Sequence, residues 1–199
     1  MPEDGLPLTG SDGRLRCPWG VTAADYEAYH DTEWGRPVRG DDALFERISL
    51  EAFQSGLSWL TILRRREGFR AAFAGFRIAE VAAFTGEDEA RLLADSGIIR
   101  NRAKIVATLA NARVAAKLPT GELDRLIWSF APDATGRPAP RTTAEVPAIT
   151  PESRALAKGL RELGFRFVGP TTAYALMQAC GLVDDHLADC CVRPGGSPG

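Results

Sequence analysis

The sequence predicts an all-α fold, and two observations lead to that prediction. Apolar residues recur every three or four positions through most of the chain, and the segments with this period mostly end at Gly or at a residue that caps helices. No segment alternates apolar and polar residues convincingly, as a half-buried strand would. With 199 residues, of which 45% are hydrophobic and 25% charged, the chain is long enough to bury one core.

The clearest helical pattern spans residues 41–56, where Asp41 or Asp42 is available as the N-cap. A second helix is expected to follow Thr150 as its N-cap, with Pro151 at the first helical position. Both signals have a physical basis, because a side-chain oxygen accepts from an unpaired backbone N–H and proline has no N–H to leave unpaired. Other helices are expected within residues 58–76, 78–86, 87–97 and 101–118.

We expect a single domain of two helical lobes over residues 14–194, between disordered tails at 1–13 and 195–199. The stretch 131–151 is rich in Pro, Thr and Ala and is expected to be a long surface loop. No apolar run is long enough to span a bilayer, and the polar, acidic N-terminus is unlike a signal peptide. These features predict a cytoplasmic protein with no membrane association, and a monomer without an obligate protein partner is the default.

Charge and cysteine content restrict the function classes. A net charge of −2 gives no global attraction to nucleic acid, so any phosphate binding must come from local basic clusters and backbone N–H groups. The four cysteines do not resemble the disulfide framework of a small secreted protein. In a reducing compartment their expected roles are core packing and metal ligation, and Cys180 lies in an apolar run that favours the core.

Cysteine and histidine residues near both ends of the chain suggest a metal site. His186 and Cys190 have the i, i+4 spacing that places two side chains on one face of a helix, and His30 lies thirteen residues after Cys17. One such pair from each end would form a Cys₂His₂ zinc site that joins the terminal segments. The alternative is that the histidines are ordinary surface or core residues and the cysteines small hydrophobes. The residues alone leave both interpretations open.

A short turn is predicted between two helices at residues 167–170. Gly169 permits a tight backbone path, and Pro170 suits the first position of the next helix. Unpaired N–H groups at such a helix start can bind a DNA phosphate. Taken by itself, this turn is common and is only a weak indication of DNA binding.

The turn resembles the helix-hairpin-helix of the base-excision DNA glycosylases, which it matches at Val168, Gly169, Thr172 and Ala173. The later stretch VDDH is similar to the one that carries the catalytic aspartate of that superfamily, with Asp184 at its place. Alternatively, Asp184 or Asp185 only caps a final helix. Bifunctional members have a Schiff-base lysine where this chain has Thr171, so the resemblance implies a glycosylase without lyase activity.

Five blocks in the right order then identify the chain as a member of the DNA-3-methyladenine glycosylase I family. They are the opening CPW…YEAYHDTEWG and the blocks LEAFQSGLSW, SGIIRNRAKI, LIWSF and FVGPTTAYALMQACGLVDDHLADCC. The likeness runs from about Arg16 to Pro194 and leaves out the N-terminal tail and the loop at 132–150. It implies an enzyme of helix-hairpin-helix architecture, with a zinc site that joins the N- and C-terminal segments.

The resemblance implies that double-stranded DNA with alkylated bases is the substrate. The enzyme would flip 3-methyladenine out of the duplex, hydrolyse its N-glycosidic bond and so start base excision repair.

The resemblance also implies site residues. One structural zinc is implied, and its ligands fall on Cys17, His30, His186 and Cys190. The base pocket falls on Trp19, Tyr26, Tyr29, Glu51 and Trp59. Glu51 is the implied catalytic group, because its charge complements a cationic base. Residues that fill the gap in the duplex fall on Gln54, Gly56 and Leu57. Phosphate contacts of the hairpin are expected at Gly169, Pro170, Thr171 and Thr172.

Two other function classes fit parts of the sequence. A zinc hydrolase would use the metal to activate water, although four protein ligands leave no open position for that water. A non-catalytic helix-hairpin-helix module would bind DNA without cleaving any bond.

Overall fold

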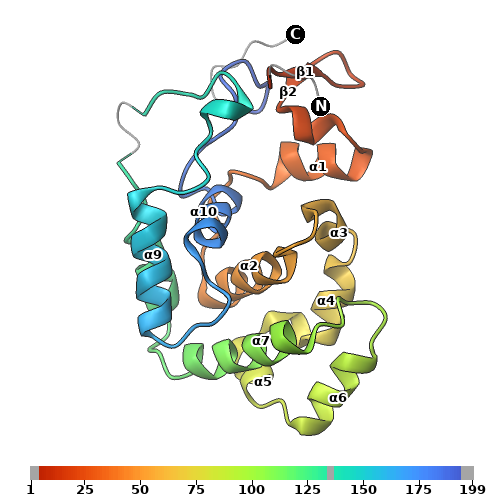
Figure 1. Ribbon diagram of the computed structural model, residues 1–199, viewed down its shortest axis with the longest axis vertical. Helices are drawn as coiled ribbons and strands as arrows, with labels where there is room; N and C mark the ends of the chain where they lie inside the picture. Colours follow the sequence, from red (N-terminus) through yellow and green to blue (C-terminus); the bar gives the residue numbers. More distant parts are fainter. Residues whose placement is uncertain (1–4, 134–136, 194–199) are drawn as a thin grey trace. The chain divides into compact units, whose positions relative to one another are not determined.

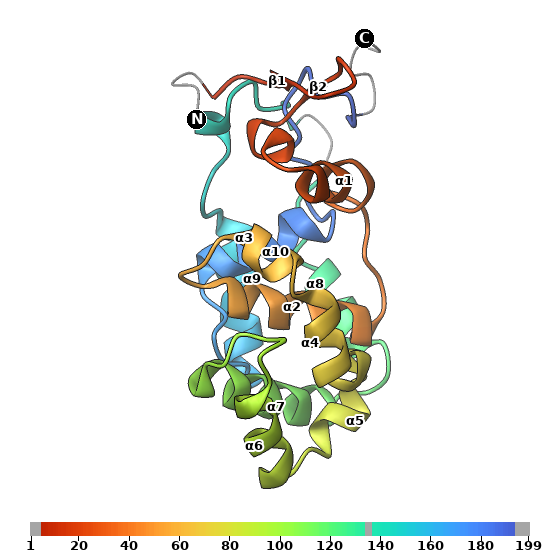
Figure 2. The same ribbon diagram turned by 90° about the vertical axis from the view of Figure 1, so that its right-hand side faces the viewer.

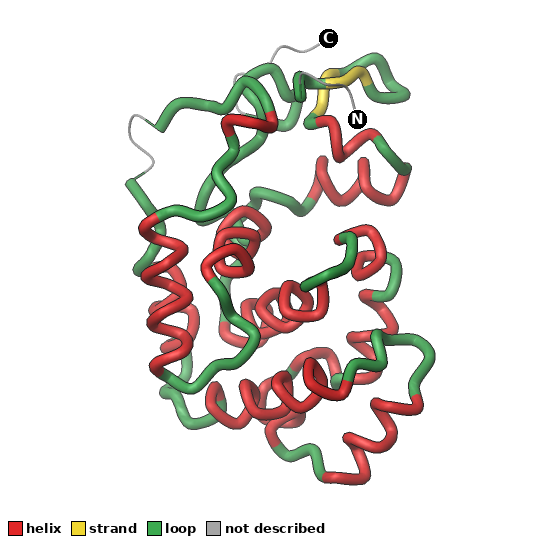
Figure 3. The backbone as a smooth tube through the Cα atoms, in the orientation of Figure 1, coloured by secondary structure: helices red, strands yellow, loops and turns green. Residues whose placement is uncertain are grey.

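The computed structural model describes residues 5–133 and 137–193 and is mostly helical (Figures 1 and 3). Within these residues the only strands are β1 (Leu8–Thr9) and β2 (Leu15–Arg16), which form one antiparallel pair. The predicted helical class is therefore confirmed. Strands of two residues are too short to produce a recognisable alternation, which is why the sequence did not indicate them. β1 lies in the stretch 1–13 that was expected to be a disordered tail; residues 1–4 and 194–199 lie outside the described residues.

The described chain divides into two compact units. Unit 1 combines the N-terminal segment up to Pro37 with residues of two later segments, 131–148 and 177–193. Unit 2 consists of residues 38–130 and 149–176. No helix in the described part of the chain has the length and apolar character needed to cross a membrane.

Unit 1 is held together by hydrogen bonds between segments that lie far apart in the sequence. The backbone N–H of Thr143 donates to the Gly5 carbonyl, and that of Cys191 donates to the Leu15 carbonyl. The expected surface loop is thereby tied to the N-terminal segment, and its Pro140 is buried. Figure 2 shows the strand pair and α1 of this unit side by side. The helical elements that begin in unit 1 are η1 (Pro18–Val21), α1 (Ala24–Thr32) and η3 (Thr143–Glu145).

Unit 2 is built around α2 (Asp41–Gln54), whose apolar face packs on a cluster of phenylalanines. The Phe53 and Phe69 rings lie 4.6 Å apart, and those of Phe73 and Phe76 lie 5.4 Å apart. All four rings are fully buried, so they supply much of the apolar surface that stabilises this unit. The remaining elements that begin in unit 2 are α3 (Trp59–Leu63), α4 (Arg66–Ala72), η2 (Ala74–Phe76), α5 (Ile78–Ala82), α6 (Gly86–Ala94), α7 (Arg102–Ala115), α8 (Glu122–Trp128), α9 (Pro151–Glu162) and α10 (Pro170–Ala179).

The starts of α9 and α10 agree with the predicted signals. Thr150 is the N-cap of α9, where its hydroxyl accepts from the Ser153 N–H at 3.2 Å, and Pro151 is the first helical residue. Pro170 opens α10. The expected N-cap of α2 is wrong, because Gly40 holds that position. Asp41 accepts instead from the N–H groups of Gly121 and Asp124, at the start of α8.

No final helix is present after α10 in the described residues. The chain leaves α10 through Gly181, which has a φ of +72°, and continues to residue 193 in turns, bends and irregular backbone. The Asp184 side chain accepts from the N–H of His186 at 3.1 Å, a local bond that competes with helix formation. Asp185 is buried against Gln178 and Arg137. The alternative that either aspartate caps a final helix is therefore wrong.

Candidate metal centre and candidate catalytic glutamate

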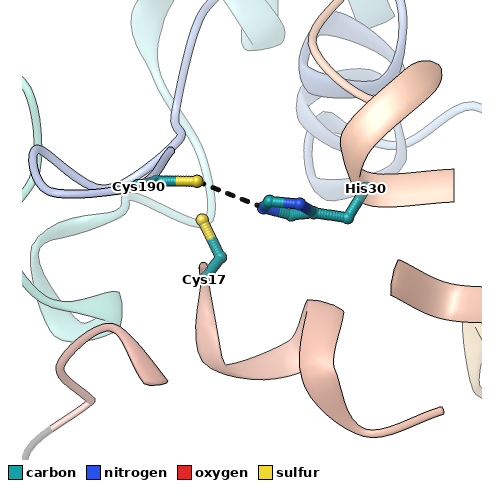
Figure 4. A group of neighbouring side chains, drawn as sticks. All are labelled: Cys17, His30 and Cys190. Carbon is teal, nitrogen blue, oxygen red and sulfur yellow. Dashed lines mark hydrogen bonds between the residues drawn. The ribbon is translucent and has the colours of Figure 1, made fainter. Parts of the chain in front are cut away.

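Three predicted zinc ligands from distant parts of the sequence meet inside unit 1. Cys17 precedes η1, His30 is near the end of α1, and Cys190 lies in the C-terminal segment. Their ligand atoms lie within 4.8 Å of one another and all three residues are buried (Figure 4). The Cys190 Sγ lies 3.5 Å from His30 Nε2, and the Cys17 Sγ accepts from the Leu187 N–H at 3.4 Å. This group can hold a metal ion.

His186, the fourth predicted ligand, lies beside this group. Its ring centroid lies 5.0 Å from that of His30, and its Nδ1 is 2.9 Å from an Asp184 oxygen. Its Nε2 is buried and has no hydrogen-bond partner among the described residues. Leaving a buried ring nitrogen unpaired costs free energy, and a metal ion would remove that cost. The helical i, i+4 argument for His186 and Cys190 is wrong, since they lie in an irregular segment. Both residues are buried, but the group whose ligand atoms lie within 4.8 Å of one another contains Cys190 and not His186.

Each histidine pairs with a carboxylate on the side away from its Nε2. His30 Nδ1 lies 2.7 Å from an Asp31 oxygen, as His186 Nδ1 does from Asp184. Arg16, itself buried, bonds to Asp31 at 2.8 Å, and Arg193 lies 3.5 Å from Asp184. In metal sites such carboxylates fix the ring orientation and leave Nε2 for the metal. The pairing therefore fits a metal centre with two histidine ligands.

The electrostatics of the two thiols also fit. A hydrogen bond from Cys17 lowers the pKa of Cys190 to about 4, and His30 lowers it further, while burial opposes the shift. The pKa of Cys17 is raised, because it is the donor in that bond and because it is buried. Burial alone would lower the pKa of His30, but its bonds with Cys190 and Asp31 raise it. The lowered pKa of Cys190 favours its thiolate, the form that ligates metals.

Two glycines allow the imidazoles to fit. A Cβ on Gly20 would lie 2.8 Å from the His30 ring, and one on Gly35 would lie 2.7 Å from the His186 ring. The Trp34 ring packs 4.6 Å from His186. Sequence reasoning assigned no role to Gly20, Gly35 or Trp34, although the last two close the block YHDTEWG. Cys191 is only half-buried and lies outside the metal-binding group, and Cys180 is buried, as its apolar run predicts.

The predicted base-binding aromatics of unit 1 form one cluster. The Trp19 ring lies 5.0 Å from Tyr26 and 6.3 Å from Tyr29. Trp19 also packs 5.1 Å from the His30 ring, so this cluster adjoins the candidate metal centre. Of the two tyrosines in this cluster, Tyr29 is buried.

Glu51 and Trp59 belong to unit 2. Glu51 lies in the last turns of α2 and is 5% exposed, although carboxylates are rarely buried. None of the described residues donates a hydrogen bond to it. Burial raises the pKa of Glu51 to about 8, and the charge of Arg47 opposes the rise. A buried carboxyl group with a strongly raised pKa is a marker of functional sites. Trp59, at the start of α3, is also buried.

The predicted DNA-contact residues lie in two loops of unit 2. After α2 the chain turns at Gly56, with a φ of +81°, and exposes 41% of Leu57. The turn before α10 places Phe167 in the left-handed region at a φ of +56°. The N–H of Ala173 donates to the Gly169 carbonyl, so the first turn of α10 is formed. A groove of about 610 Å³ next to Leu57 is lined by Ser58, Leu60, Thr61, Arg64, Arg65, Gly68 and Gly97.

Comparisons with known proteins agree with this description. The family model for methyladenine glycosylases matches residues 19–193. The DNA-3-methyladenine glycosylase 1 of Escherichia coli K12 is 46% identical over 92% of this chain and 99% of its own. A crystal structure of a 3-methyladenine DNA glycosylase I is 44% identical, has a TM-score of 0.83 and covers 90% of this chain and 100% of its own. The Staphylococcus aureus structure that describes 3-methyladenine recognition is 32% identical, has a TM-score of 0.80 and covers 89% of this chain and 96% of its own.

The helical fold together with these matches defines the class of a DNA glycosylase, an enzyme that hydrolyses N-glycosidic bonds. The chain belongs to the methyladenine glycosylase family. The resemblance noted in the sequence is thereby confirmed.

Proposed function

We propose that this enzyme excises 3-methyladenine from alkylated double-stranded DNA and so begins base excision repair. The names of its relatives support this substrate, since the Escherichia coli and Haemophilus influenzae proteins are called DNA-3-methyladenine glycosylases. The observation that carries the proposal is the burial of Glu51 without a hydrogen-bond donor among the described residues. Such a carboxyl group is ready to interact with a ligand of opposite charge.

Charge complementarity explains the choice of base. A base methylated at N3 carries positive charge, so its N-glycosidic bond is already weak and needs little further activation. A bound cation favours the ionised form of Glu51, which burial disfavours in the free protein. Neutral adenine does not provide this compensation and would leave the carboxyl group protonated. Glu51 therefore acts both in selecting the damaged base and in stabilising the charge near the breaking bond.

Aromatic side chains provide the rest of the recognition. The base must leave the helical stack before any residue can reach the glycosidic bond. Following the family resemblance, we assign stacking on the flipped base to Tyr29 and Trp59. Trp19 and Tyr26, which neighbour Tyr29 in unit 1, are assigned to base binding as well. A cation over such a ring gains about 1–2 kcal/mol where water is excluded. The burial of Tyr29 and Trp59 supports this assignment.

The reaction is proposed to be hydrolysis alone, without strand cleavage. Thr171 stands where bifunctional relatives of the superfamily carry a Schiff-base lysine, and a hydroxyl group cannot form that intermediate. Asp184, the candidate for activating water, bonds to His186 through both the ring Nδ1 and the backbone N–H. We propose that Asp184 orients His186 and that it is not the general base.

Two loops are proposed to hold the DNA. Gln54, Gly56 and Leu57 fill the space that the flipped base leaves, and the exposure of Leu57 supports this role. The backbone from Gly169 to Thr172, in the turn of a helix-hairpin-helix, holds a phosphate. Arg64 and Arg65 line the groove that follows this loop in the sequence, and we propose them as further phosphate contacts.

We propose that the metal centre binds one zinc ion with a structural role. Its ligands are Cys17, His30, His186 and Cys190, a set that closes a tetrahedron and leaves no position for a substrate or a reactive water. This argues against a zinc hydrolase. The cytoplasmic location and the monomeric state stay predictions.

The test of the function is base release. The protein is incubated with DNA treated with a methylating agent, and free 3-methyladenine is separated and quantified. We expect release from the wild type with the phosphodiester backbone left intact. Glu51→Gln should reduce the rate about 100-fold, because the substitution keeps the shape and removes the charge. Glu67→Gln, on an exposed glutamate of the same unit, serves as the control and should retain full activity.

Two outcomes would contradict the proposal. If no base is released at high enzyme concentration although DNA is bound, the protein is a non-catalytic DNA-binding module. If Glu51→Gln folds and excises 3-methyladenine at the wild-type rate, the role assigned to Glu51 is wrong.

A further inference from the structure

Three polar side chains are buried on one face of α7, a position that cores normally fill with apolar residues. Lys104, Thr108 and Asn111 have the spacing i, i+4, i+7, and each is at most 6% exposed. Thr108 bonds only within the helix, where its hydroxyl donates to the Lys104 carbonyl at 3.0 Å. Lys104 and Asn111 bond to backbone groups outside α7, so these two buried side chains connect the helix to other segments of unit 2.

Lys104 binds the C-terminal end of α2. Its ammonium donates to the carbonyl oxygens of Phe53 at 2.9 Å and Ser55 at 2.6 Å. Carbonyls at a helix C-terminus lack partners within the helix, and the helix dipole favours a cation there. The chain then turns at Gly56 and exposes Leu57. The side chain of Lys104 thus determines where the loop of residues 54–57 leaves its helix.

Asn111 fastens the turn before α10 in a similar way. Its amide oxygen accepts from the Arg166 N–H at 2.8 Å, and its amide nitrogen donates to the Arg166 carbonyl at 3.1 Å. The next residue, Phe167, has a φ of +56° and is 43% exposed. A bulky residue in the left-handed region costs about 1–3 kcal/mol, and such strain persists only when its surroundings hold it. The two hydrogen bonds of Asn111 fix Arg166, which directly precedes the strained Phe167.

We propose that Lys104 and Asn111 are positioning residues, through which α7 holds the loop of residues 54–57 and the turn of residues 165–170 at a fixed separation for DNA binding. This rests on the proposed function, which assigns both segments to DNA. The two anchors are seven residues apart, or roughly 10 Å along the helix axis. Each anchored segment presents an exposed apolar side chain, Leu57 or Phe167, and apolar side chains that contact bases are common in proteins that distort DNA.

Affinity for DNA, measured apart from affinity for the base, tests this role. Lys104→Met removes the ammonium, and Asn111→Leu removes both amide bonds. Each should weaken binding of a duplex that contains one tetrahydrofuran abasic site about tenfold, the effect of losing the order imposed by one or two hydrogen bonds. Binding of free 3-methyladenine and the zinc content should stay at wild-type values, because neither variant touches those sites. If Lys104→Met does not fold, Lys104→Gln takes its place: its shorter, uncharged side chain cannot bond to both carbonyl oxygens, so duplex binding should weaken in the same direction.

Thr108→Val is the matched control, since Thr108 lies on the same face of α7, is equally buried and anchors no loop. It should lower the melting temperature without weakening DNA binding. If Thr108→Val weakens DNA binding as much as the anchor variants do, the effect is general destabilisation and the positioning role is wrong. The role is also wrong if folded anchor variants bind the duplex as the wild type does. A wild-type protein that binds neither duplex nor 3-methyladenine would instead contradict the proposed function.

Discussion

The candidate metal centre and Glu51 are both buried and ionisable, but they differ in how their charges are compensated. At the metal centre each histidine pairs with an aspartate, each aspartate with an arginine, and one thiol with the other. Glu51 receives no such bond, and burial shifts its pKa towards the neutral form. The buried groups that are paired hold the chain together, whereas the buried group that is unpaired is available to a ligand. At the candidate metal centre, His186 Nε2 is the buried atom without a hydrogen-bond partner among the described residues, and a metal ion would supply one.

The largest effect is expected from a substitution in the candidate metal centre. Cys190→Ser should abolish stoichiometric zinc binding and destabilise the protein on the order of 5 kcal/mol, because binding of a structural metal is coupled to folding. Zinc content of the purified protein and its thermal unfolding measure both effects. Cys191→Ser is the matched control, since the neighbouring thiol is half-buried and outside the group that can hold the metal. A Cys190→Ser protein that keeps one equivalent of zinc and its stability would show that the four residues are only core packing.

The second effect concerns Glu51 and the dependence of stability on pH. The folded-state pKa of about 8 lies above the reference value of 4.5, so the wild type loses stability as pH rises through that window. The loss approaches about 1.4 kcal/mol per pH unit within the window and stops above it. Glu51→Gln cannot ionise and should not show this loss. Its free energy of unfolding, relative to the wild type, should therefore rise by a few kcal/mol between pH 5 and pH 9.

Denaturant unfolding of both proteins at several pH values measures that difference. Subtracting the two curves removes contributions that both proteins share, including protonation of the metal ligands at low pH. Glu67→Gln, with its exposed carboxyl group, should follow the wild type throughout. A difference between wild type and Glu51→Gln that does not change with pH would mean that Glu51 ionises normally, and the contrast between the two regions would disappear.

Signals that act over a few residues were predictable from the sequence, and contacts that depend on the fold were not. Thr150 and Pro170 mark helix starts because caps depend on neighbouring residues. Asp41 was expected to cap its own helix, but it bonds to residues about eighty positions away, which no local rule reveals. The C-terminal segment was expected to be helical, and a local Asp184 bond together with the buried Asp185 keeps it irregular.

The same division applies to the site. Cys17 and His30 were identifiable as candidate ligands because few residue types bind zinc and the chain has only two histidines. Asp31 and Arg16 were not, because their roles depend on side-chain geometry formed only in the folded protein. The family resemblance indicated Glu51, but its raised pKa results from burial and is a property of the fold.

The smallest effect distinguishes ligation from the support of the ligands. Asp31→Asn leaves all four proposed zinc ligands in place and removes the charge that orients His30. Loss of such a partner typically weakens metal affinity 10- to 100-fold, or about 1.4–2.8 kcal/mol. Competition with a chelator measures the zinc affinity, and excision at saturating zinc should stay near the wild-type rate.

Asp12→Asn separates the two bonds that Asp31 makes. Asp12 also bonds to Arg16, at 2.6 Å, but it does not contact a histidine. Asp12→Asn should therefore lower stability without changing zinc affinity, whereas Asp31→Asn should change both. If the two variants lose zinc equally, the paired carboxylates support the metal centre only through Arg16 and the surrounding fold. The chain of bonds from Arg16 through Asp31 to His30 would then have no specific role in orienting the histidine. In that case the candidate metal centre would differ from the surroundings of Glu51 only in how its side chains pack.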